Sequence, residues 1–168
     1  LPLYAADLSD LTYDASGATV TITDCDEAAA GDLVIPDTIE GKAVTAIGFQ
    51  AFLVCANLTS ITLPEGVTSI GNSAFSSCTS LTSMTIPESV TRIGEEAFSD
   101  CRSLTSVIIP GSVTSIESST FYSCSSLTSV NISDGVTSIG YGAFYECTSL
   151  ASVTIPGSIT SIGEEAFY

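Results

Sequence analysis

The sequence contains no histidine, and only three of its 168 residues are lysine or arginine. Without histidine there is no Ser-His-Asp triad, no Cys-His pair and no imidazole metal ligand, which excludes most familiar hydrolase mechanisms. The 19 Asp and Glu residues give a formal net charge of 3 − 19 = −16. Because this charge repels phosphate and anionic lipid headgroups, nucleic-acid binding is excluded as well.

Long hydrophobic runs are also missing. The longest nearly apolar stretch, 46–56, has 11 residues and is interrupted by Gln50, whereas a membrane-spanning helix needs roughly 18 to 20. No membrane insertion is therefore expected. The apolar start, Leu1 to Ala6, ends in small residues before Asp7, and is typical of a residual secretory signal peptide, with an ordinary N-terminal arm as the alternative.

What the chain has instead is an internal repeat. Cysteines stand at 25, 55, 78, 101, 124 and 147, and the last four intervals are 23 residues each. Five copies begin at Cys55 and its successors. A degenerate copy begins at Cys25, with two extra residues before Pro36 and five between Pro36 and Ile47. A unit this short buries its apolar side only by stacking on similar units, so the period predicts a solenoid.

The apolar positions within each copy favour strands over helices. In the copy from Cys101 they are Leu104, Val107, Ile109, Val113, Ile116 and Phe121. The spacing of two between Val107 and Ile109 is typical of a β-strand, and no copy sustains a 3.6-residue pattern. With 45% hydrophobic residues and a mean hydropathy of +0.46, the chain is expected to fold around one core that is mainly β.

Three columns of the repeat carry further predictions. The phenylalanines are expected to stack as one file along the solenoid axis; they are Phe52, Phe75, Phe98, Phe121, Phe144 and Phe167. A glycine column suits a tight corner, but Glu117 occupies it in one copy, so an obligatory positive φ is not expected. Ser133 replaces the proline that ends the strand in the other copies. The corners at Glu117 and Ser133 are expected to differ slightly from the rest.

The repeated string C-x-x-L-x-x-I-x-I-P-x-x-V-x-x-I-G-x-x-A-F-x-x resembles the BspA-like, Treponema-type class of leucine-rich repeats, found in bacterial cell-surface proteins. The resemblance covers about Leu33 to Tyr168. It implies a right-handed coil in which the L-T-S-V-T-I run lines one face as a parallel sheet. It also implies adhesion to host or matrix proteins or to neighbouring cells.

Three segments make up the expected organisation. Residues 1–10 are the signal-peptide remnant or arm, 11–32 form an N-terminal capping β-hairpin, and 33–168 form the leucine-rich-repeat solenoid. The hairpin is predicted from the alternation on either side of Gly17, and the cap from the exposed core that an open solenoid end would have. No comparable cap precedes Tyr168, so we expect the natural chain to continue.

Neither the cysteines nor the carboxylates point to chemistry. Equivalent cysteines in successive coils have parallel Cβ vectors, which disfavours disulfides and indicates small buried hydrophobic residues. With no C-x-x-C motif and no histidine, no metal or other cofactor is expected. The pairs Glu95-Glu96 and Glu164-Glu165 could act in glycoside cleavage or bind calcium, but surface carboxylates usually only keep a protein soluble. No catalytic residue is therefore assigned.

The exposed strand positions are the binding candidates. If the apolar residues point inward, period-2 geometry turns the residues between them outward. The candidate binding residues are Ser60, Thr62, Ser83, Thr85, Ser106, Ile108, Ser129, Asn131, Ser152 and Thr154. They predict a broad, shallow recognition face of the kind that solenoids present, although small hydroxyl residues also simply suit a β surface.

The prediction is therefore a secreted or cell-surface leucine-rich-repeat module, without catalytic activity, that binds an extracellular protein or glycan. A structural spacer within a larger surface protein is the alternative. Binding of ice or a crystalline polysaccharide would need a regular hydroxyl lattice, which Ile108, Asn131 and Arg92 interrupt. The column of Leu53, Ser76, Ser99, Tyr122, Tyr145 and Tyr168 could anchor a ligand, but packing against further coils is the preferred interpretation.

Overall fold

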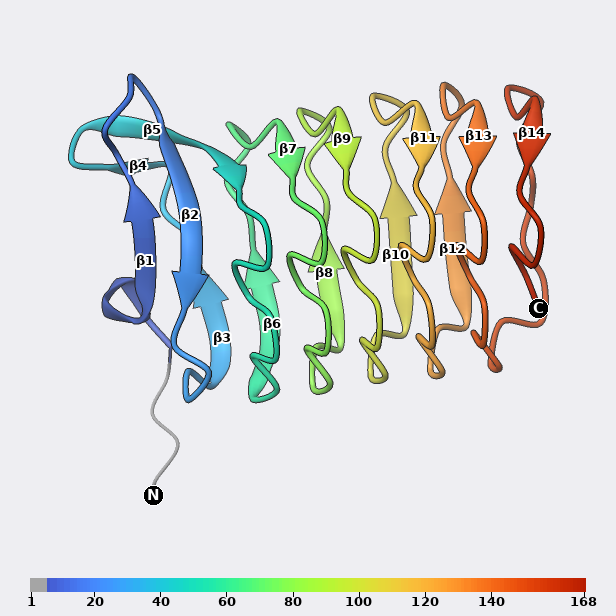
Figure 1. Ribbon diagram of the computed structural model, residues 1–168, viewed down its shortest axis with the longest axis horizontal. Coiled ribbons are helices and arrows are strands. Elements are labelled where there is room, and N and C mark those ends of the chain that lie inside the picture. The colour runs from blue at the N-terminus through green and yellow to red at the C-terminus, as the bar shows by residue number, and fades with distance from the viewer. Residues whose placement is uncertain (1–5) are drawn as a thin grey trace.

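The computed structural model describes residues 6–168 as one stack of coils (Figure 1). The element order is η1 (Leu8–Asp10, a 3-10 helix), β1 (Leu11–Asp14), β2 (Val20–Cys25), β3 (Gly31–Val34), β4 (Thr38–Ile39), β5 (Lys42–Ile47), β6 (Leu58–Thr62), β7 (Ser69–Ile70), β8 (Ser83–Thr85), β9 (Arg92–Ile93), β10 (Ser106–Ile109), β11 (Ser115–Ile116), β12 (Ser129–Ile132), β13 (Ser138–Ile139) and β14 (Ser161–Ile162). Within the described range no α-helix is formed, and hence none that could cross a membrane. The first five residues of the predicted signal-peptide remnant lie outside that range.

Successive coils pair in parallel at the register that the period predicts. Ile61 lies opposite Met84, Val107 opposite Val130 and Ile139 opposite Ile162. The longer strands line one side of the stack and the two-residue strands another, as Figure 1 shows. A third side is closed by turns whose amides bond to the next coil, as from Phe75 N to Ala97 O at 2.8 Å. The mainly β solenoid is therefore confirmed.

A single file of phenylalanine rings runs through the core. From Phe52 to Phe167 each ring stacks on the next, with centroids 5.0–5.3 Å apart and planes within 18° of parallel. The first five rings are fully buried, whereas Phe167 in the last coil is exposed. Offset stacking of this kind adds to the hydrophobic burial of each ring. The predicted aromatic file is therefore confirmed.

The six cysteines are all buried and unpaired. The thiol of Cys78 donates a hydrogen bond to the carbonyl of Phe52 at 3.2 Å, and Cys101, Cys124 and Cys147 repeat this contact one coil on. Burial raises the pKa of the Cys101 thiol to about 12. These side chains are therefore core residues, and among the described residues no group of Cys, Asp or Glu is placed to hold a metal ion.

The N-terminal strands β1 and β2 form an antiparallel pair where the sequence predicts a hairpin, and β2 continues in parallel onto β5. The five extra residues of the degenerate copy form a second hairpin, β4–β5, which the sequence did not predict. Its turn has positive φ at Glu40 (53°) and at Gly41 (75°), as two-residue hairpin turns require. The capping role and the boundaries at 10 and 32 stay predictions.

Glycine is needed in its column because of close packing. None of these glycines has a positive φ, as expected. A Cβ added to Gly71 would lie 2.6 Å from the carbonyl carbon of Gly48, and one added to Gly163 would lie 2.6 Å from that of Gly140. Real Cβ atoms do not approach backbone this closely, so the corner admits only glycine at the normal spacing between coils.

Glu117 occupies this column, and both strand ladders break at its coil. Strands β9 and β11 belong to different sheets, and so do β8 and β10. The glycines at this position donate to the isoleucine of the preceding coil, as from Gly94 N to Ile70 O at 2.9 Å, but Glu117 N forms no such bond. At the normal spacing a Cβ in this column meets the backbone of the preceding coil, as it would at Gly94 and Gly140, which explains why Glu117 lacks this bond. The corner thus differs far more than the sequence indicated.

The two coils stay joined on their third side. Phe98 N still donates to Thr120 O and Asp100 N to Tyr122 O, both at 2.8 Å. At the other substituted corner, Ser133 donates from its amide to Ile109 O at 3.1 Å, a bond that proline could not make. The strand ladders are therefore interrupted at one junction, between the coils that begin at Cys78 and Cys101, although on the longer-strand side Thr105 N still donates to Thr82 O at 3.2 Å.

Candidate recognition face

The outward residues of β6, β8, β10 and β12, with those of 152–154, are called here the strand face. Nine of the ten candidate residues are exposed, and Ser60 is half-buried. The residues between them on the strands, Ile61, Met84, Val107 and Val130, are buried. The structure thus brings eight of the candidates, from Ser60 to Asn131, onto four neighbouring strands.

Ser152 and Thr154 are exposed but lie in a segment, 151–156, to which no strand is assigned. The sequence predicted that they extend the ladder beyond Ser129 and Asn131. The last coil has a neighbour on one side only within the chain, and its Val153 is not fully covered. A strand held from one side only is less constrained, so this pair does not continue the regular surface.

The strand face has two further members that sequence reasoning missed. Asp32 and Val34 on β3 lie opposite Ser60 and Thr62, and Val34 is 67% exposed. The alignment of repeat columns could have found them, but the two-residue insertion before Pro36 shifts the degenerate copy out of register. The face therefore begins one coil earlier than predicted.

Within the described chain, Asp32 is the one carboxylate that accepts a hydrogen bond from a predicted binding residue. It accepts hydrogen bonds from Ser60 Oγ at 2.7 Å and Thr59 Oγ1 at 2.9 Å. The bond from Ser60, followed by that from Thr59, lowers the pKa of Asp32. Because Asp32 holds these two hydroxyls, the first coils of the face are acidic and ordered at neutral pH.

A neighbouring column of threonines has a structural role. Thr82 Oγ1 donates to Thr59 O, Thr105 Oγ1 to Thr82 O and Thr128 Oγ1 to Thr105 O, at 3.1–3.2 Å. These hydroxyls are bound along the stack, so they are not the ones that face a ligand. The side chains of Thr62, Ser83 and Thr85 form no hydrogen bond with another described residue, which leaves them available.

The strand face is hollowed over β6, β8 and β10. The hollow has a volume of about 510 Å³ and is open to solvent. Its lining contains the candidate residues Ser60, Thr62, Ser83, Thr85, Ser106 and Ile108. Glu65 and Glu88, which follow the prolines that end two of the strand runs, contribute carboxylates. Six of the ten predicted site residues thus line one concave surface.

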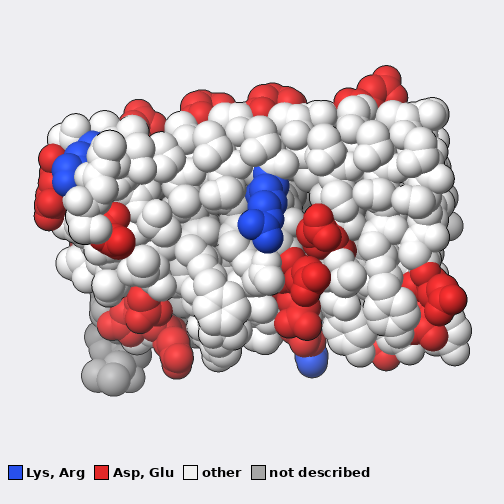
Figure 2. Space-filling model, turned by 45° about the horizontal axis from the view of Figure 1, so that its top comes forward, with Lys and Arg blue, Asp and Glu red and all other residues white. Residues whose placement is uncertain are grey.

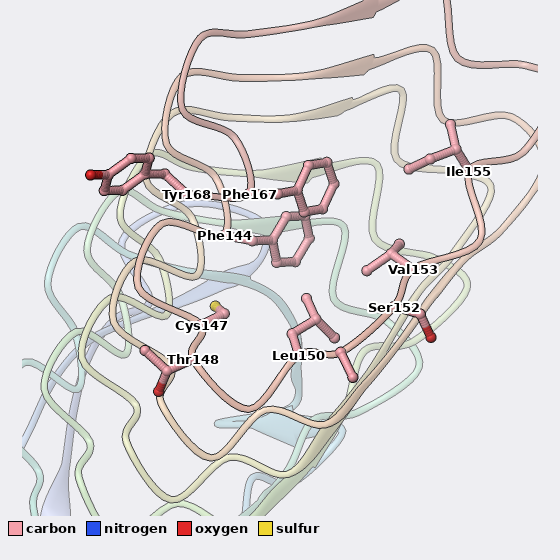
Figure 3. Close-up of a pocket in the computed structure, with 10 residues that line it drawn as sticks. Phe144, Cys147, Thr148, Leu150, Ser152, Val153, Ile155, Phe167 and Tyr168 are labelled. Atoms are coloured by element: carbon pink, nitrogen blue, oxygen red, sulfur yellow. The ribbon is translucent and has the colours of Figure 1, made fainter.

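A second hollow, of about 480 Å³, lies at the C-terminal end of the stack. Figure 3 shows Phe144 and Phe167 stacked on one side of it, with Leu150 and Val153 on another. These are core residues of the last coils, and among the predicted site residues only Ser152 joins them. The hollow is therefore the uncovered end of the core. Continuation past Tyr168 stays a prediction.

The tyrosine column lies outside the strand face. Tyr122, Tyr145 and Tyr168 stack with centroids 5.3 and 5.1 Å apart. Tyr141 donates to Glu165 Oε2 at 2.6 Å, and this bond raises the pKa of the tyrosine. Because the rings stack on one another, each covers its neighbours' faces, as expected of side chains that pack along the coils.

The acidic side chains of this protein far outnumber the basic side chains that could pair with them. In the face that Figure 2 presents, acidic side chains form several separate groups with few basic ones among them. Of the three basic residues, Arg102 pairs with Asp100 at 2.8 Å and Lys42 donates to the carbonyl of Ala15. No lysine or arginine follows Arg102 in the sequence. The surface therefore favours cationic or neutral partners over anionic ones.

Comparison with protein families matches residues 45–168 to the BspA type leucine rich repeat region, in six copies. Comparison with curated proteins gives no significant match. Among solved structures, a leucine-rich repeat protein of T. pallidum superimposes with a TM-score of 0.74 at 24% identity, covering 95% of this chain and 86% of that one. This likeness shows the fold.

Two solved structures are more similar in sequence. A leucine-rich cell-surface protein of Faecalibacterium prausnitzii is 33% identical, with a TM-score of 0.66, and the match covers 94% of this chain and 49% of that one. A leucine-rich repeat protein of Bacteroides capillosus is 31% identical, with a TM-score of 0.60, covering 75% of this chain and 96% of that one. This chain thus spans about half the length of the first.

Proposed function

This chain belongs to the BspA-type leucine-rich repeat family, and on that premise we propose that it is a recognition module, secreted or displayed at the cell surface, that binds an extracellular protein through the strand face. A surface location is supported by the F. prausnitzii relative, which is described as a cell-surface protein. In this proposal the module binds without catalysing a reaction, since no titratable side chain of the strand face is paired with a second one for acid–base work.

One observation carries the proposal. Exposed side chains of four neighbouring strands lie over a buried core in two registered pairs, β6–β8 and β10–β12, and those of β6, β8 and β10 line a hollow of about 510 Å³. Their backbones are fixed by the neighbouring coils, so a partner that docks there meets a surface that loses little conformational entropy. Broad, rigid faces of this kind are the usual binding surfaces of solenoid proteins.

A spacer role is the second candidate, favoured by the match that covers only 49% of the F. prausnitzii chain. In that case the stack would hold another domain away from the cell without binding anything itself. Removal of the strand face would then leave the function of the larger protein unchanged, whereas shortening the stack by one 23-residue coil would alter it.

The test is a binding screen against extracellular matrix proteins and glycans with a face variant and a matched control. The face variant carries Ser106→Arg and Ser129→Arg on β10 and β12. The control carries Thr114→Arg and Thr137→Arg, exposed positions in the same two coils on the side of the short strands. Binding about tenfold weaker in the face variant alone is the expected result. Equal binding by both variants would move the site elsewhere.

A further inference from the structure

The hollow on the strand face lies at the junction where both strand ladders are interrupted. Its lining comes from β6, β8 and β10 and the turns that follow them, and β8 and β10 are the neighbouring strands that do not pair. On the other strand side, the same two coils lack their ladder bonds at the corner where Glu117 takes the place of a glycine. One substitution thus coincides with the break in both ladders and with the concavity.

The lining of the hollow combines serine and threonine hydroxyls with apolar and acidic groups. Met84, Ile86 and Val107 are buried but contribute to its surface, and Ile108 beside them is 59% exposed. Glu65 and Glu88 are exposed, and neither forms an ion pair within the described chain. A surface of hydroxyls with one exposed aliphatic residue, flanked by two unpaired carboxylates, matches an extended segment that carries an aliphatic side chain and cations.

We propose that this hollow binds an extended segment of a partner protein, with one aliphatic side chain against Ile108 and with lysine or arginine residues facing Glu65 and Glu88. The inference rests on the proposed function and names the part of the strand face that selects the partner. In this proposal Glu117 acts as a positioning residue, because its Cβ prevents the close glycine-type contact at the corner of the two coils and so shapes the hollow.

The lining favours a peptide over a glycan. It contains no tryptophan, tyrosine or phenylalanine, the side chains whose flat faces commonly stack on other ring systems. It contains no lysine or arginine either, so acidic sugars and acidic peptides meet only carboxylates. A basic segment with an aliphatic residue satisfies both features at once.

The first test selects binders from a displayed library of random nonapeptides. Selected sequences are expected to combine Lys or Arg with Leu, Ile or Met. For one such synthetic peptide, the double variant Glu65→Gln and Glu88→Gln is expected to bind about fivefold more weakly at low ionic strength, and the difference is expected to shrink at about 0.5 M NaCl because salt screens exposed charges. The matched control is Glu95→Gln with Glu164→Gln, exposed carboxylates outside the hollow. Selection of acidic peptides, of no peptide, or of peptides indifferent to Glu65 and Glu88 would overturn the proposal.

The second test separates the Cβ of Glu117 from its charge. Glu117→Gly removes the wedge and is expected to let Thr114 N and the residue 117 amide bond to the preceding coil, which hydrogen exchange would detect as new protection. The selected peptide is then expected to bind about threefold more weakly, as part of the apolar contact is lost. Glu117→Ala keeps a Cβ and is expected to keep wild-type affinity. Equal affinity of the Gly variant, despite new amide protection, would refute the positioning role.

The two proposals can fail separately. If the arginine variants of Ser106 and Ser129 abolish binding of a matrix protein while the Glu65 and Glu88 variant binds it normally, the strand face is the site but the hollow does not select the partner. If neither pair of changes alters binding, the proposed function is wrong in assigning binding to the strand face.

Discussion

The glycine corner offers a sharp test of how closely the coils pack. In Gly71→Ala the added Cβ would lie 2.6 Å from the carbonyl carbon of Gly48, 2.7 Å from its oxygen and 2.8 Å from Phe49 N. All three are backbone atoms, so relief of the contact requires the two coils to separate as they do at Glu117. We therefore expect a second break in the short-strand ladder.

The cost follows from the hydrogen bonds at that corner. Separation would break Gly71 N to Ile47 O and Thr68 N to Thr45 O, both 2.9 Å long, and each is worth about 1 kcal/mol net. Replacement of glycine by alanine also raises the free energy of unfolding by about 0.5–1 kcal/mol, because it lowers the entropy of the unfolded chain. The free energy of unfolding is thus expected to fall by about 1–2 kcal/mol.

The control for this experiment is Gly157→Ala. A Cβ at Gly157 meets nothing within 4 Å, and its φ is not positive, so the same chemical change is expected to be neutral or to stabilise by up to about 1 kcal/mol. Urea unfolding gives both free energies, and hydrogen exchange at Thr68 reports the local break. If the two variants unfold at the same urea concentration, the close-packing explanation of the glycine column is wrong, and with it the explanation of the junction at Glu117.

Three further predictions concern the core, pH and thiol reactivity. Phe98→Ala removes the middle of the ring file and is expected to lower the free energy of unfolding by about 3–5 kcal/mol, measured by urea titration; a loss below 1 kcal/mol would mean that the file contributes little. Hydrogen bonds from Ser60 and then Thr59 lower the pKa of Asp32. The stability that ionised Asp32 contributes is therefore complete above its unfolded-state pKa, near 3.8. That stability is lost as the pH falls through the lower pKa of the folded state. Asp32→Asn is therefore expected to flatten the pH dependence of unfolding below pH 4, and an unchanged profile would contradict this. Because burial raises the pKa of Cys101 to about 12, iodoacetamide at pH 8 is expected to label this thiol only after urea unfolding, as judged by mass spectrometry; labelling of the folded chain would show that the coils open readily.

Glu117 links the sequence to the proposed site. In the other copies, the glycine allows a spacing at which the short-strand ladder stays paired. At the junction before Glu117 this ladder is interrupted, while the bonds from Phe98 N and Asp100 N keep the coils together. A repeat protein can thus create a local, asymmetric surface from nearly identical units by changing one closely packed position, without altering the core columns.

The strand face was only partly predictable for a related reason. Alternation on the strands places Ser83 and Thr85 outward from sequence alone, because a strand's period fixes which side chains share a face. Asp32 and Val34 were missed because the insertion obscured their register, and only their pairing with Ser60 and Thr62 shows it. The hollow beside Met84 is lined by side chains of three coils, and its shape depends on how those coils pack together.

The period of 23, the buried columns and the ring file were determined by the sequence itself, since each copy repeats the same inward and outward positions and stacking is the one way to bury them. Tertiary structure alone decided what happens where a copy departs from the pattern: the β4–β5 hairpin in the degenerate copy, the strand lost at 151–156, and the break beside Glu117. These outcomes depend on distances between backbone atoms of different coils, as between Gly71 and Gly48, and such distances exist only once the chain has folded.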